Sequence, residues 1–237
     1  MIASSGDRTS FLAGLDVELA RKATAEFIGT AFLLAGVVGS GIMAERLSAD
    51  VGLILLQNAF ATGAVLVALI LALGPASGAH FNPAVTLADR LLAGIDNVTA
   101  AVYMAAQVLG GAVGVMAANL MFGLDPVNWS TKDRTDPELV FAEVIATFGL
   151  ILVIYGVVRS GKPTLAAFTV GGYIAAAYYF TSSTSFANPA VTLARTLSNT
   201  FAGIAPGGVP AFVAAQFAAA IIGAVVMRFL YPGTSAE

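Results

Sequence analysis

Two copies of one seven-residue segment carry the clearest chemical signal in the chain. The letters Asn-Pro-Ala-Val-Thr-Leu-Ala occur from Asn82 and again from Asn188, an offset of 188 − 82 = 106 residues. Asparagine is a good helix N-cap and proline suits the first helical position, so each copy predicts the start of a helix. Each such end carries about half a positive charge from the helix dipole, and the asparagine adds amide donors. We assign the two helix starts to one candidate site. Its residues are Asn82, Pro83, Ala84, Asn188, Pro189 and Ala190.

Few other side chains could do chemistry. The chain has no cysteine and only one histidine, His80, whereas a metal site needs several ligands at suitable spacing. No nucleophile, base and orienting group stand out together, and no pair of carboxylates does. The sequence therefore predicts no catalytic residues, no metal site and no cofactor.

Composition places the chain in a membrane. Of its 237 residues 58% are hydrophobic and 11% charged, whereas a soluble domain carries about 25% charged residues. The mean hydropathy is +0.86. The net charge of −3 comes with no basic patch, which excludes a nucleic-acid partner. The first 20 residues lack the pattern of a signal peptide and are expected to form a soluble tail.

Six segments are long and apolar enough to cross a bilayer, which takes about 20 residues. Two further apolar segments begin at the repeated copies and are only long enough to cross half of it. Irregular backbone at membrane depth must be buried in protein or line a wet cavity. The expected fold is an all-α membrane protein with six transmembrane helices and two re-entrant half-helices. The six spans are 23–44, 51–73, 98–122, 139–158, 164–180 and 208–227.

The repeat extends beyond the two copies and divides the chain into halves. "AEFIGT" at Ala25 matches "AEVIAT" at Ala142, and "AAQVLGGAVG" matches "AAQFAAAIIG" in the third and sixth spans. Three spans per half force the second half to enter the membrane upside down, which brings both half-helix starts to the midplane. Small residues four apart predict close helix contacts; they are Gly110, Gly114, Ala219 and Gly223. The expected divisions are a tail 1–20, a first half-repeat 21–122, an extracellular loop 123–138, a second half-repeat 139–231 and a tail 232–237.

The placement of lysine and arginine predicts the orientation. With the N-terminus inside, seven Lys and Arg residues lie on the inner side and four on the outer side. This excess favours cytoplasmic N- and C-termini. We therefore expect a multi-pass protein of the cell (inner or plasma) membrane, embedded in the lipid bilayer.

The sequence resembles the major intrinsic proteins, the aquaporins and glycerol facilitators, over residues 20–230. The likeness lies in both Asn-Pro-Ala boxes, the surrounding "SGAHFNPAV", the paired "AE" helix starts and the six-span spacing. It implies a right-handed six-helix bundle, one pore per protomer and a homotetramer that passes water and small neutral solutes. It also implies that Asn82 and Asn188 donate to the permeating molecule. Glu26 and Glu143 match residues that brace the re-entrant loops, and His80 matches one that supports the first loop.

The sequence departs from the family pattern at the outer constriction. Most members have an arginine directly after the second box, and here that residue is Val191. Family register gives Thr62, Ala176 and Ser185 as the other three residues of the selectivity filter. This filter would have no arginine, histidine or aromatic ring and would be wide. Arginine presents rigid donors and a fixed charge, and valine presents neither.

Two charged residues follow the boxes at matching positions. Arg195, one helical turn beyond Val191, could reach the outer vestibule and partly replace the missing charge. The alternative is a surface arginine that extends its charged end to water. Asp89 is the matching residue of the first half, so the two mouths would carry charges of opposite sign.

Valine at this position also resembles a bacterial subgroup associated with arsenic resistance, which implies a conduit for neutral arsenite and other metalloid hydroxides. Three alternatives stay open. The protein could be a water-selective aquaporin, an alternating-access secondary transporter or a scaffold with a closed pore. Transporters carry coupling charges within their spans, and here only Glu26 and Glu143 lie there.

Overall fold

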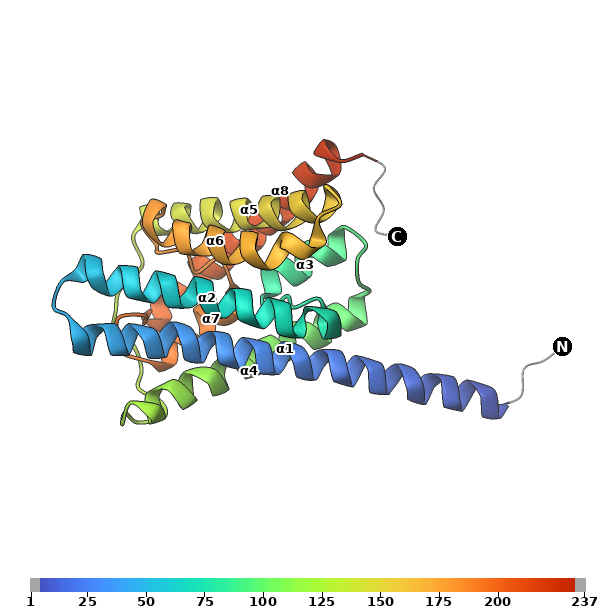
Figure 1. Cartoon of the computed structure of the whole chain (residues 1–237), viewed down its shortest axis with the longest axis horizontal. Coiled ribbons are helices and arrows are strands. Elements are labelled where there is room, and N and C mark those ends of the chain that lie inside the picture. Colours follow the sequence, from blue (N-terminus) through green and yellow to red (C-terminus); the bar gives the residue numbers. More distant parts are fainter. Residues whose placement is uncertain (1–4, 233–237) are drawn as a thin grey trace.

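The computed structural model describes residues 5–232, with side chains from residue 17 onward, and every regular element in this range is a helix. The long helices lie side by side along the long axis of the molecule, and α1 begins at the same end of the bundle at which α8 ends (Figure 1). We call this end the termini side and the opposite end, which holds the 122–136 connection, the loop side. The elements are α1 Ser5–Leu47, α2 Val51–Ser77, α3 Pro83–Leu91, α4 Asn97–Met121, α5 Pro137–Arg159, η1 Pro163–Leu165, α6 Ala166–Phe180, α7 Pro189–Ala194, η2 Arg195–Leu197, η3 Pro206–Gly208 and α8 Val209–Leu230.

The element order agrees with six spans and two half-helices. Among the described residues, five helices are long and apolar enough to cross a membrane, and they correspond to α1, α2, α4, α5 and α8. The fifth predicted span is α6, whose 15 residues follow the short turn η1. The half-helices α3 and α7 have 9 and 6 residues. The chain therefore has the lengths needed for an aquaporin-like bundle.

Two boundaries differ from the sequence prediction. Residues 5–20, expected as a soluble tail, form the first turns of α1, which project beyond the other helices (Figure 1). Helix α2 continues through Pro75 to Ser77 instead of ending near residue 73. A proline so close to a helix end removes only one of the last hydrogen bonds. Gly78 then ends the helix with a left-handed φ of 88°, and its N–H donates to the Gly74 carbonyl oxygen.

Small residues let the helices of each half approach closely, as predicted. A methyl group added at Gly110 would overlap the carbonyl oxygen of Phe27, and one at Gly114 would overlap that of Ala31. These two glycines form the crossing of α4 over α1. In the second half, a methyl group at Gly223 would lie 2.8 Å from Cγ2 of Ile151, where α8 crosses α5. The small side chains thus fix the helix spacing around the centre.

Replacing Gly114 by alanine tests this contact. The added methyl group meets backbone, which cannot move aside, so the free energy of unfolding should fall by about 1–3 kcal/mol. The measurement is thermal unfolding of purified protein in detergent. Gly172→Ala is the matched control, because a methyl group there meets nothing within 4 Å and the residue also lies within a helix. Equal midpoints for the two variants would contradict the close-contact assignment.

Candidate functional site

The two Asn-Pro-Ala boxes meet at the centre of the bundle and hold each other in place. Nδ2 of Asn82 donates to the carbonyl oxygen of Ala187 at 2.7 Å, and Nδ2 of Asn188 donates to that of Phe81 at 2.8 Å. Each asparagine also caps its own half-helix, because its Oδ1 accepts the N–H of the alanine two residues on, at 2.9 Å in both cases. An amide nitrogen has two protons, so each asparagine keeps one N–H for another acceptor.

A cavity of about 210 Å³ runs past these asparagines. Side chains of the long helices form an apolar wall, in which Thr62, Leu66 and Ile70 are four residues apart along α2. Residues 78–82 and 185–188, together with both half-helices, form the remaining, more polar part of the wall. We call this cavity the conduit. Its two-sided wall suits a solute that has both apolar and hydroxyl surface.

The backbone before each box is held in a conformation that non-glycine residues rarely adopt. The φ angles are 52° at Ala79 and 50° at Phe81, and 51° at Ser185 and 48° at Ala187. These pairs are related by the same offset of 106 residues as the boxes. Each such residue costs of order 1–3 kcal/mol and persists only where its surroundings impose it.

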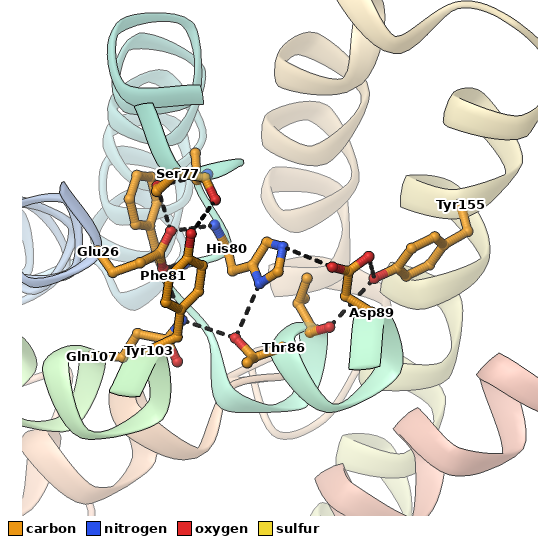
Figure 2. Close-up of polar contacts among 11 residues, drawn as sticks. Glu26, Ser77, His80, Phe81, Thr86, Asp89, Tyr103, Gln107 and Tyr155 are labelled. Atoms are coloured by element: carbon orange, nitrogen blue, oxygen red, sulfur yellow. Dashed lines mark hydrogen bonds and ion pairs between the residues drawn. The ribbon is translucent and has the colours of Figure 1, made fainter. Parts of the chain in front are cut away.

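Glu26 supplies that constraint in the first half (Figure 2). Its Oε1 accepts the N–H of His80 at 3.0 Å and its Oε2 accepts that of Phe81 at 2.6 Å. The hydroxyl of Ser77 and Nε2 of Gln107 also donate to this carboxylate, at 2.6 and 2.8 Å. The side chain is fully buried. These four donors compensate the burial of a charge that would otherwise be costly at membrane depth.

Glu143 has the equivalent contacts in the second half. It accepts the N–H groups of Phe186 and Ala187, both at 2.8 Å, and Nε2 of Gln216 at 2.6 Å. Both glutamates therefore make the contacts that the proposed bracing role needs. Sequence reasoning did not single out Gln107 and Gln216, although both lie in the repeated "AAQ" segments.

The residues expected at the outer constriction are not all brought together. Thr62, Ser185 and Val191 line the conduit, whereas Ala176 is exposed on the far side of α6. The assignment of Ala176 is therefore wrong. Residues four apart share a helix face, and on α6 the conduit face holds Val170, Ile174 and Tyr178.

Tyr178 takes the place expected for Ala176. Its hydroxyl lies 3.1 Å from Oγ1 of Thr62, and its side chain is buried in the conduit wall. The expectation of a constriction without an aromatic ring is therefore wrong as well. Sequence reasoning missed Tyr178 because α6 is apolar on all sides, so its pattern does not show which face points inward.

Arg195 lies in the conduit wall, which contradicts the alternative of a surface arginine. Its side chain is 2% exposed and its Nε donates to the carbonyl oxygen of Ala202. Its guanidinium carbon lies 3.4 Å from the centre of the Phe186 ring, a cation–π contact. The conduit wall therefore contains an arginine one turn beyond Val191, as the vestibule alternative expected. An arginine-free filter at the level of Val191 stays a prediction.

The loop-side connection adds two more cations near this arginine. Nε of Arg134 donates to the carbonyl oxygen of Gly203 at 3.0 Å, and Nζ of Lys132 donates to that of Phe201 at 2.8 Å. Burial, together with the positive charges of Arg134 and Arg195, lowers the pKa of Lys132 to about 8. The negative charge of Glu45 acts in the other direction and raises this pKa. Of the three cations, Arg195 is the one that lines the conduit.

The termini-side part of the conduit has a different set of polar groups. His80, Asp89 and Tyr155 line it together, although they come from the first loop, α3 and α5. The His80 backbone is held by Glu26 as described, and its ring nitrogen Nδ1 lies 3.1 Å from Oγ1 of Thr86 (Figure 2). Sequence reasoning did not identify Tyr155, since no local pattern relates it to the box.

Glu143→Gln tests the bracing contacts. A glutamine at this position has no negative charge, and its NH2 group would face the backbone N–H groups of the loop, which also donate. The free energy of unfolding should therefore fall by at least about 2 kcal/mol. Water permeability of proteoliposomes should fall with it. Glu138→Gln is the matched control, because Glu138 lies exposed in the first turn of the same helix. Unchanged stability and permeability of Glu143→Gln would show that the loop holds its shape without the carboxylate.

Comparison with known proteins agrees with this geometry. The model of the family described as major intrinsic protein matches residues 15–171. The chain is 48% identical over 215 residues to Aquaglyceroporin AqpS of Rhizobium meliloti (strain 1021), covering 91% of this chain and 92% of that protein. It is 30% identical over 174 residues to Aquaporin NIP1-2 of Arabidopsis thaliana, covering 69% of this chain and 58% of that protein.

The fold is shared with a solved channel. The X-ray structure of the aquaglyceroporin from Plasmodium falciparum matches with a TM-score of 0.70 and 23% identity, over 92% of this chain and 97% of that one. The predicted all-helical, aquaporin-like fold is thereby confirmed. The chain belongs to the major intrinsic protein family, and it is a multi-pass membrane channel for small neutral solutes rather than an enzyme.

Proposed function

We propose that this channel passively conducts water and small polyhydroxyl solutes, among them glycerol-like polyols and neutral arsenite, As(OH)3. The paired asparagines carry this proposal, because each keeps one N–H in a conduit whose wall is otherwise largely apolar. A neutral solute with hydroxyl oxygens accepts these bonds as it sheds water. A cation meets two helix N-termini and is repelled.

Val191 supports the passage of solutes larger than water. It lines the conduit at the position from which most family members extend an arginine, and it offers neither that bulk nor those donors. Arg195 keeps a positive charge in the wall, but its guanidinium packs on Phe186. The proposed filter is therefore Thr62, Tyr178, Ser185 and Val191, with Arg195 in the outer vestibule. The water-selective alternative stays open because the ring of Tyr178 takes up space in this part of the conduit.

The buried glutamates favour a channel over a transporter. A coupled transporter needs charges that can change partners during its cycle. Glu26 and Glu143 each accept two backbone N–H groups and a glutamine, so both are committed to the loops.

The remaining proposals concern the assembly. The half-repeats 21–122 and 139–231 together enclose one pore, and four copies form a homotetramer in the cell membrane. The termini side faces the cytoplasm, in line with its excess of lysine and arginine. Large apolar side chains exposed on the outer helix faces, such as Phe32, Phe60 and Phe229, suit contact with lipid or with neighbouring copies.

The deciding experiment compares wild type, Val191→Arg and Val191→Leu in proteoliposomes. Stopped-flow light scattering gives the permeability to water and glycerol, and arsenite uptake is measured directly. We expect the wild type to pass all three. Val191→Arg should reduce glycerol and arsenite permeability at least tenfold and water permeability less than threefold.

Val191→Leu separates bulk from charge, because it adds size without donors. A leucine variant that resembles wild type assigns the block to the guanidinium, and one that resembles Val191→Arg assigns it to size. A wild type that passes only water would overturn the proposed solute range. A Val191→Arg variant that passes glycerol as the wild type does would show that the filter lies elsewhere.

A further inference from the structure

The inverted repeat places one acidic and one basic side chain in the conduit wall, on opposite sides of the asparagines. The offset that relates the boxes also relates Asp89 to Arg195 and His80 to Phe186, since 195 − 89 and 186 − 80 both equal 106. Helices α3 and α7 start at the two asparagines and run to opposite sides. Arg228 near the end of α8 donates to the carbonyl oxygen of Leu91, whereas the N–H of Ser130 in the loop-side connection donates to that of Thr196. Each charge lies seven residues beyond its asparagine, about 10 Å along a helix at 1.5 Å per residue. A carboxylate thus lies toward the termini side and a guanidinium toward the loop side.

Asp89 belongs to the conduit wall and not to the outer surface. It lines the cavity, and its side chain is 19% exposed. Its Oδ1 lies 3.3 Å from the hydroxyl of Tyr155, and its Oδ2 lies 3.6 Å from Nε2 of His80 (Figure 2). Among the described residues it has no ion pair with lysine or arginine.

Helix stability does not account for this carboxylate. Asp89 lies in the last turn of α3, where the negative end of the helix dipole disfavours an anion. The hydroxyl of Tyr155 does not need Asp89 as a hydrogen-bond acceptor either, because the carbonyl oxygen of Val85 lies at the same distance of 3.3 Å. In contrast, the matching Arg195 has the sign that a helix C-terminus favours.

The protons around His80 leave the carboxylate available to a solute. Nε2 of Gln107 can only donate, and it donates to Oγ1 of Thr86 at 2.9 Å. Among the described contacts, the only acceptor for the Thr86 proton is Nδ1 of His80. His80 then carries its own proton on Nε2, which faces Asp89. The His80 proton therefore faces Oδ2 of the carboxylate, and the Tyr155 hydroxyl, whose single proton is shared between Asp89 and the Val85 carbonyl, lies beside Oδ1. Among the described residues no other side chain donates to this carboxylate.

We propose that Asp89 is a specificity-determining residue. With His80 and Tyr155 it forms an acceptor site at the termini-side mouth, which binds the hydroxyl groups of neutral solutes and repels anions. Solutes thus pass from donors at the asparagines to acceptors at Asp89. On the loop side, the guanidinium of Arg195 in the conduit wall repels cations. This inference rests on the proposed function and adds a second selective site to it.

The test compares wild type, Asp89→Asn and Asp89→Leu in proteoliposomes. Water and glycerol permeability come from stopped-flow light scattering, and chloride entry comes from quenching of an entrapped halide-sensitive fluorophore. Asp89→Asn keeps an acceptor oxygen, so glycerol permeability should stay within twofold while chloride entry rises at least fivefold. Asp89→Leu removes acceptor and charge, so glycerol permeability should fall at least fivefold and water permeability less than twofold. Asp96→Asn, the same change outside the conduit on the same side, should match wild type.

The outcomes separate this inference from the proposed function. If wild type passes glycerol and both Asp89 variants equal it in glycerol and chloride permeability, the inference is overturned and the proposed function stands. If wild type passes neither glycerol nor arsenite, the inference and the proposed function are both overturned. Should Asp89→Leu also lose water permeability, the isosteric Asp89→Asn decides alone, and chloride entry at the wild-type level contradicts the inference.

Discussion

Unpaired backbone at the middle of a membrane is the constraint on which this structure depends. No water is available there to satisfy a peptide group, so a loop at that depth needs protein partners for its N–H groups. Glu26 and Glu143 supply them, and each carboxylate takes two consecutive N–H groups of its loop. The left-handed residues beside them keep their strained conformation because those bonds require it. The asparagines, the cavity and the opposed half-helices all follow from the fixed loops.

Both halves use one scaffold, but their side chains have diverged where the conduit meets its two mouths. The boxes, glutamates and glutamines recur with nearly the same contacts, because both loops face the same problem of satisfying buried backbone. Beyond them the repeat places His80 with Asp89 on one side and Phe186 with Arg195 on the other. Selectivity can therefore vary at the mouths without disturbing the centre.

The sequence predicts the elements whose signals are local. Helix caps at Asn82 and Asn188, the span lengths and the buried glutamates could all be recognised from residue type, apolar length and repetition. The inward face of α6 could not be recognised, because a helix that is apolar on every side has no pattern that distinguishes Ala176 from Tyr178. For Arg195 the sequence left two places open, the vestibule and the surface. The choice depends on Phe186 and Ala202, which the half-helix brings near only in the folded chain.

The shift of the arginine by one turn separates two effects of that side chain, its bulk and its positive charge, which otherwise act at the same position. An arginine directly after the box would add both its bulk and its charge at the position of Val191. At residue 195 the positive charge stays in the wall, but the guanidinium packs on an aromatic ring and donates to backbone. A positive charge thus remains in the conduit wall, while the position of Val191 is left small and apolar. Under the proposed function, such a wall admits larger neutral hydroxylated solutes and still repels cations, because different residues supply the positive charge and limit the width.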